Sequence, residues 1–103
     1  MEPTLDDLRR SAELAGKVNV KPDCGDIVFW ERGMRLIWHP PSKPYQDREL
    51  LHAIRAVGWQ VHYNDIKWMH WITHPSKGLD ILIEGDTNDF LTLAASRLQG
   101  MKG

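Results

Sequence analysis

The chain has 103 residues, of which 42% are hydrophobic and 26% are charged, a composition that argues against intrinsic disorder. Thirteen basic and fourteen acidic side chains leave a net charge of −1, which excludes a strong whole-protein attraction to nucleic acid or anionic lipid. The single cysteine excludes an internal disulfide and a cysteine pair for zinc. We expect one cytoplasmic domain over residues 1–103, because no signal peptide or membrane-spanning run is recognisable.

The chain is expected to begin with an amphipathic helix over residues 4–15. Its apolar residues recur at helical spacing, Thr4 and Asp7 are spaced as a capping pair, and Gly16 follows as a stop. Residues 17–26 mix valines with asparagine, proline and glycine, which indicates a connector or a short edge strand.

A β-hairpin is predicted next, because residues 27–30 and 34–39 are rich in β-branched and aromatic side chains. The three-residue link 31–33 ends in Gly33, which suits a hairpin loop with glycine in the left-handed conformation. Three prolines then disfavour regular strand pairing, so we expect residues 40–45 to form a stiff extended loop.

The second half of the chain predicts a helix, an antiparallel meander and a last helix. The second helix is expected to start at a cap on Asp47 and to stop at Gly58. Alternating character predicts the three strands of the meander, which are residues 59–63, 67–73 and 79–84. The last helix is closed by Gly100, and its candidate caps are Asp86, Thr87 and Asn88.

The resulting order is α-β-β-α-β-β-β-α, without repeats or a long linker. Antiparallel hairpins between helices predict an α+β fold, in which helices cover one antiparallel sheet of about five strands. The same order argues against a parallel doubly wound fold.

Five tryptophans are the most unusual feature, and all fall in expected strands: Trp30, Trp38, Trp59, Trp68 and Trp71. One interpretation is that these rings fill the space between sheet and helices. The other is an aromatic surface for a partner protein or for stacked bases. Since side chains alternate across a regular strand, Trp68 and Trp71 are expected on opposite faces, which favours at least one exposed indole.

Histidines suggest a metal or acid–base hypothesis. His62 and His70 lie on strands joined by the 64–66 turn, so their side chains are neighbours if register and face agree. However, the sequence lacks the usual zinc-ligand spacings, and no serine has a Gly-x-Ser-x-Gly context. We therefore expect no catalytic residue, no metal and no cofactor, with a small hydrolase or metal enzyme as a minor alternative.

Nucleic-acid binding is the main alternative, because residues 47–99 have the element order of a double-stranded-RNA-binding domain. Such a domain needs lysines at the start of its final helix, where this chain has Asp86 and Asp89. Two acids at that position repel phosphates, so the topology alone is weak support. The basic residues that this alternative would use are Lys67, Lys77, Arg48 and Arg55.

The same segment also resembles a known family. Its elements are a helix ending in Gly58-Trp59, a strand, a Trp-bearing strand at 67–73, a third strand and an Asp-Thr-capped, Ala-rich helix. The order of these elements resembles that of the phage ABA sandwich domains. The resemblance covers residues 47–99. It implies a phage or mobile-element origin and a role as an accessory factor or an inhibitor of host machinery, with no catalytic residues to carry over.

The sequence therefore favours a non-catalytic protein-binding domain that docks on another protein or on itself, and not on a membrane. The surplus of aromatics, the balanced charge and the missing catalytic motif support this hypothesis. The candidate binding residues are Trp68, Trp71, Tyr63 and His70 of the meander, with Tyr45 and Trp38 beside the proline loop.

Overall fold

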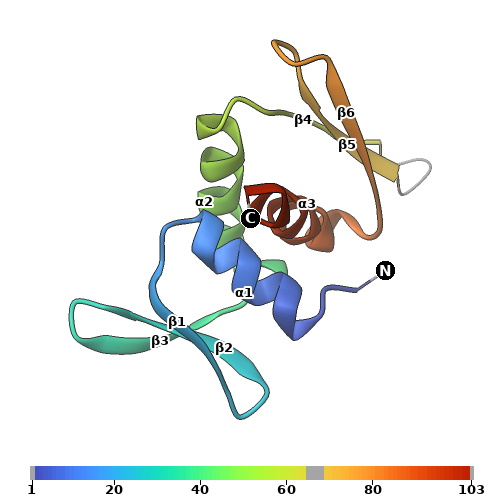
Figure 1. Cartoon of the computed structure of the whole chain (residues 1–103). Coiled ribbons are helices and arrows are strands. Elements are labelled where there is room, and N and C mark those ends of the chain that lie inside the picture. The colour runs from blue at the N-terminus through green and yellow to red at the C-terminus, as the bar shows by residue number, and fades with distance from the viewer. Residues whose placement is uncertain (1, 65–68, 103) are drawn as a thin grey trace.

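The computed structural model describes residues 2–64 and 69–102 and has an α+β architecture. Three helices lie at the centre, and the strands form two sheets on opposite sides of them (Figure 1). The helices are α1 (Leu5–Leu14), α2 (Pro44–Ala56) and α3 (Thr87–Lys102). The first sheet contains β1 (Val18–Asp23), β2 (Asp26–Glu31) and β3 (Met34–Trp38). The second sheet contains β4 (Gln60–His62), β5 (Met69–His74) and β6 (Leu79–Glu84).

The α+β class is confirmed, but the expected single sheet of about five strands is wrong. Residues 17–26, left open as connector or strand, contain β1, and the six described strands form two separate antiparallel sheets. The reason is visible in Figure 1: the chain leaves β3, passes through α2, and begins β4 on the other side of the helices.

Two tight turns shape the first sheet. Both residues of each turn, 24–25 and 32–33, have a positive φ between 51° and 84°. Glu31 pairs directly with Met34, so the expected three-residue link is a two-residue turn. Positive φ at both positions defines the turn whose twist matches that of the flanking strands, and each turn places glycine second.

The proline-rich segment is not the extended loop expected for residues 40–45. Pro40–Ser42 form a 3-10 turn, and Pro44 is the first residue of α2. Proline suits this position because its φ is already helical and no intrahelical bond needs its missing N–H group. The helix therefore begins before Asp47, which is not its cap.

Caps at the helix ends were predicted more accurately. Thr4 caps α1: the backbone N–H of Asp7 donates to Thr4 Oγ1 at 3.1 Å, and the backbone N–H of Thr4 donates to Asp7 Oδ2 at 2.9 Å. Gly16 and Gly58 follow α1 and α2 with left-handed backbone, as expected.

Of the three expected caps of the last helix, Asp86 is the one that the structure supports, but the helix ends later than expected. Asp86 precedes α3, and its Oδ1 accepts the backbone N–H of Asn88 at 2.9 Å. Gly100 has no positive φ and does not close the helix, which continues to Lys102. A glycine lowers helix stability by only about 1 kcal/mol, so one glycine near the end does not force a stop.

The antiparallel meander is confirmed as the order β4-β5-β6. One cluster of buried apolar side chains extends from the first sheet through the three helices to the second sheet. The sheets contribute Ile27, Phe29, Trp38, Ile72 and Ile83. Within residues 2–64 and 69–102, no helix is long and apolar enough to cross a membrane.

Buried polar contacts connect the first sheet to the helices. The indole Nε1 of Trp38 donates to Ser11 Oγ at 2.9 Å, and that hydroxyl donates to the carbonyl of Leu8 at 2.7 Å. Gln46, buried at the start of α2, accepts the backbone N–H that follows Trp38 and donates to the carbonyl that precedes it. These bonds satisfy polar groups that burial would otherwise leave unpaired.

Candidate binding surface

The second sheet has one face against α3 and one face turned away from the helices. Burial alternates along β5: His70, Ile72 and His74 are buried, whereas Trp71 and Thr73 are partly exposed. We call the face that carries Trp71 the outer face. No described helix covers it, and α2 and α3 contact the sheet from the other side (Figure 1).

A row of three side chains crosses the outer face. His62 on β4 lies opposite Trp71 on β5, and Trp71 lies opposite Leu82 on β6. Directly opposed residues of antiparallel strands share a face and are close enough to pack. We refer to His62, Trp71 and Leu82 as the outer row.

The outer row is packed at one end and open at the other. The rings of His62 and Trp71 stack with centroids 5.1 Å apart and planes 13° from parallel. His62 Nε2 is also 3.0 Å from Thr73 Oγ1, a hydrogen bond that orients the imidazole. Leu82 is 56% exposed. The row therefore offers an oriented aromatic pair beside an aliphatic side chain that is largely in water.

The other predicted meander residues lie on the inner face. His70 is fully buried; its Nδ1 accepts the backbone N–H of Asn64 at 3.0 Å, and its ring lies 4.8 Å from that of Phe90. Tyr63 packs edge-on against His70 and Phe90, although 45% of it is exposed. Burial and the nearby charge of Asp47 raise the pKa of Tyr63 above its usual value. His70 therefore supports the sheet from inside and cannot contact a partner in this conformation.

The predicted binding residues do not converge on one surface. Trp38 is fully buried and cannot reach a partner. Tyr45 is 60% exposed, but it lies on the first turn of α2. Trp68 lies outside the described residues. Among the six predicted residues, Trp71 is the one that the structure places on the outer face, and the other described members lie elsewhere.

Sequence reasoning missed Leu82. In β6 the positions that share the outer face are Asp80, Leu82 and Glu84, so an apolar residue stands between two acids. The period-two pattern calls for a polar residue at that position if water covers this face. The signal was therefore present in the sequence, although it depended on knowing which face is buried.

Trp30 was also omitted from the predicted binding residues. It is partly exposed on β2, where Lys21 Nζ lies 5.1 Å from the centroid of its ring. A bulge in β1 beside it gives a shallow pocket lined by Asn19, Val20 and both of these residues. A lysine already occupies the ring face in this arrangement, so we do not place the main binding surface here.

The register excludes a site made of His62 and His70. Trp71, the cross-strand partner of His62, is the residue after His70, so the two imidazoles lie on opposite faces of the sheet. The described part of the chain contains no group of three histidine, cysteine, aspartate or glutamate side chains that could hold a metal. The hydrolase or metal-enzyme alternative therefore loses the residues on which it depended.

Two serine–histidine contacts occur near turns, and neither forms a triad. His39 Nδ1 lies 2.7 Å from Ser42 Oγ, and His74 Nδ1 lies 3.0 Å from Ser76 Oγ. In the described residues no carboxylate is hydrogen-bonded to either imidazole, so neither ring is oriented as a general base. Both contacts stabilise local turns.

The basic residues of the nucleic-acid alternative do not gather on the outer face. Arg48 and Arg55 are exposed on α2, and Lys77 is exposed in the turn between β5 and β6. Lys67 lies outside the described residues. The acids Asp80 and Glu84 beside Leu82 would repel phosphates on this face.

Comparison with known proteins finds no matching family model, no matching curated protein and no matching solved structure. The geometry of the outer row can bind an apolar surface, and its imidazole, His62, is stacked on Trp71 and hydrogen-bonded to Thr73.

Proposed function

We propose that this chain is a non-catalytic protein-binding domain whose outer face docks on a second protein. The observation that carries the proposal is the position of Leu82. It is more than half exposed, directly opposite Trp71, on a sheet face that no described helix covers. Single exposed leucines are common, but this one continues a stacked aromatic pair across three strands.

Burial of the outer row would contribute a useful part of the binding free energy. Full burial of a leucine side chain is worth about 1.5 to 3 kcal/mol, and roughly half of that remains available to a side chain that is 56% exposed. The stacked ring of Trp71 is already held by His62, so docking costs little side-chain entropy. Tryptophans in such surroundings often dominate the energy of interfaces.

Charge around the outer row indicates the kind of partner. Asp80 and Glu84 are exposed beside Leu82 on the same strand. A partner with a basic rim around an apolar patch would complement this arrangement and would associate faster at low salt. The resemblance to phage ABA sandwich domains adds an origin to the proposal, in which the chain is an accessory factor or inhibitor that covers a host protein in the cytoplasm.

The proposal is tested by comparing two substitutions at equally exposed positions. Leu82→Lys places a charge in the outer row. Met34→Lys places the same charge in the first sheet, away from the outer row, at a side chain that is 58% exposed. A protein that wild type captures from a host lysate should also be captured by Met34→Lys but not by Leu82→Lys. The purified partner should bind wild type and Met34→Lys with similar affinity and Leu82→Lys more weakly. Equal capture by all three proteins would reject the outer face as the binding surface.

Nucleic-acid binding remains the second hypothesis, and salt separates it from the first. Phosphate binding weakens steeply with added salt because counterions are released, whereas an apolar protein interface changes little. A labelled duplex RNA that binds with a steep salt dependence, and equally to wild type and Leu82→Lys, would favour the second hypothesis.

A further inference from the structure

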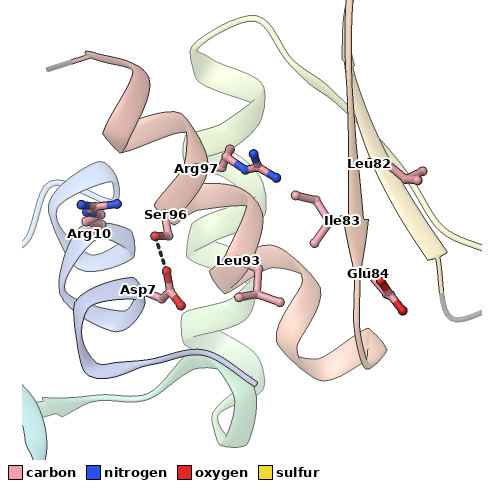
Figure 2. A pocket seen from close by; sticks show the side chains of 8 residues that line it. All are labelled: Asp7, Arg10, Leu82, Ile83, Glu84, Leu93, Ser96 and Arg97. Atoms are coloured by element: carbon pink, nitrogen blue, oxygen red, sulfur yellow. Dashed lines mark hydrogen bonds between the residues drawn. The ribbon is translucent and has the colours of Figure 1, made fainter. Parts of the chain in front are cut away.

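A groove runs along β6 between the second sheet and the helices. Figure 2 shows α3 as its floor, α1 as one wall and β6 as the other. Its volume is about 490 Å³, within the range of about 300 to 1,000 Å³ that is typical of ligand pockets. The groove therefore has room for a segment of another molecule.

One wall of the groove is the edge of a sheet. Among the described strands, β6 pairs with β5 alone, so one side of β6 has no strand partner. An edge strand presents unpaired backbone N–H and C=O groups, to which an extended peptide can add as a further strand. Strands in a sheet lie about 4.8 Å apart, so a strand added to β6 would lie over α3 on the side of α1, where the groove is.

The groove has apolar side chains between α3 and β6, and a cation that forms no ion pair with the described residues. Leu93 from α3 and Ile83 from β6 supply apolar surface between the two elements (Figure 2). Arg97, one turn further along α3, points towards β6. Its side chain is exposed and forms no ion pair with the described residues.

Neither acid that lines the groove forms an ion pair with Arg97. Asp7 Oδ1 accepts the hydroxyl of Ser96 at 2.7 Å, and its Oδ2 accepts the backbone N–H of Thr4 at 2.9 Å. The carboxylate of Glu84 points away from the floor, on the other side of β6 (Figure 2). Of the two arginines that line the groove, Arg10 is paired with Asp6 and lies near the charge of Asp7, which leaves Arg97 as the cation that an acidic group could pair with.

We infer that this groove binds an extended segment of a partner protein, which adds to β6 as a fourth strand and places a carboxylate side chain against Arg97. Since side chains alternate across a strand, the residues that lie over Leu93 and Ile83 share a face with the acid, which favours an apolar residue two positions before and two positions after it. This inference goes beyond the proposed function, because it concerns the edge of the sheet and the groove floor and would hold even if the outer face bound nothing.

The test uses two short blocked peptides in which every second residue is valine, glutamate and valine in turn, with threonine at the intervening positions, and lysine replaces the glutamate in the second peptide. Amide chemical shifts of the full chain are recorded during titration with each peptide, for wild type, Arg97→Glu and the matched control Arg48→Glu, which reverses an exposed arginine on α2. We expect the glutamate peptide to shift amides of β6 and of α3 around Arg97, and to slow hydrogen exchange along β6. Arg48→Glu should bind both peptides like wild type. Arg97→Glu should bind the glutamate peptide at least tenfold more weakly than wild type does, and should bind the lysine peptide more tightly than the glutamate peptide.

Three outcomes would overturn the inference. They are the absence of shifts at β6 with the glutamate peptide, equal binding of both peptides by wild type, and shifts that Arg97→Glu leaves unchanged. Sedimentation gives a further outcome: a dimer that Arg97→Glu dissociates would assign the groove to a second copy of the chain. Leu82 is among the residues that line the groove, but its side chain points away from α3 (Figure 2), so Arg97→Glu changes the groove floor and leaves the outer row intact.

Discussion

His62 and Trp71, opposite each other on β4 and β5, stack at a centroid distance of 5.1 Å with planes only 13° from parallel. The imidazole covers one side of the indole, and Leu82, which is largely exposed, lies opposite Trp71 on the next strand. This arrangement predicts how accessible each described tryptophan is.

The first prediction concerns that accessibility. With fluorinated tryptophan, a soluble paramagnet should broaden the fluorine resonances of Trp71 and Trp30, which are partly exposed, and spare those of Trp38 and Trp59, which are buried. His62→Ala should increase the broadening of Trp71 alone, because its covering ring is removed. Equal broadening of Trp71 in both proteins would show that the stack does not exist in solution.

A second prediction concerns the buried hydrogen bond between Trp38 and Ser11. Ser11→Ala leaves the indole N–H without a partner in the core and should lower the free energy of unfolding by about 1 to 3 kcal/mol. Urea unfolding measures the change. The same substitution in a Trp38→Phe background should cost clearly less, because the donor is already gone. Equal costs in both backgrounds would mean that the bond contributes nothing.

Asp47 gives a prediction about pH. Burial raises the pKa of its carboxyl from the ordinary 3.8 to about 6, and its Oδ1 has no hydrogen-bond partner in the described residues. Because the folded-state pKa exceeds the unfolded one, the folded state binds more protons between these values. Stability contributed by protonated Asp47 is therefore present at about pH 4 and lost as pH rises through about 6.

Asp47→Asn tests this prediction. The shift of roughly 2 pKa units corresponds to at most about 3 kcal/mol, and partial solvent exposure of the carboxyl reduces it to about 1 to 2 kcal/mol. The variant should therefore gain stability over wild type as pH rises from about 4 to about 6, then keep a constant advantage. Chemical unfolding across this range measures the difference, and a constant difference at all pH values would contradict the prediction.

Asp7 should show the opposite pH dependence. Burial alone would raise its pKa, but hydrogen bonds from Ser96 and Thr4 and the charge of Arg10 hold the pKa of Asp7 below its usual value. A lowered folded-state pKa gives stability that is present above the unfolded value and lost as pH falls. Ser96→Ala should raise the pKa of Asp7, measured by carboxyl NMR titration, and destabilise the α1–α3 contact at neutral pH by about 1 kcal/mol. An unchanged pKa of Asp7 in Ser96→Ala would show that the hydrogen bond between Ser96 and Asp7 is not formed in solution.

The sequence predicted those parts of the fold that depend on neighbouring residues. The capping pair of Thr4 and Asp7 and the meander over β4 to β6 follow from local spacing, and both are present. The division into two sheets did not follow, because both sheets pair consecutive strands only, and no local signal tells whether β3 also pairs with a strand beyond α2. The start of α2 was misplaced since Pro44 was interpreted as a breaker, whereas proline at a first helical position is favourable.

The binding surface was predictable only in part. Trp71 was correctly expected on a strand, but its partners His62 and Leu82 depend on register, which one sequence does not determine. Trp38 was placed on a surface although it is buried, because its hydrogen-bond partner Ser11 lies 27 residues away in the chain. An indole with a distant polar partner cannot be distinguished in sequence from an exposed one.

The central claim is that Leu82 on the outer face contacts a partner protein. The most direct measurement incorporates a photo-crosslinking phenylalanine derivative at position 82, and at position 34 as an equally exposed control, in the full chain inside its host. We predict one dominant crosslinked partner from position 82 and none from position 34. The same crosslinked proteins from both positions, or none from either, would contradict the claim.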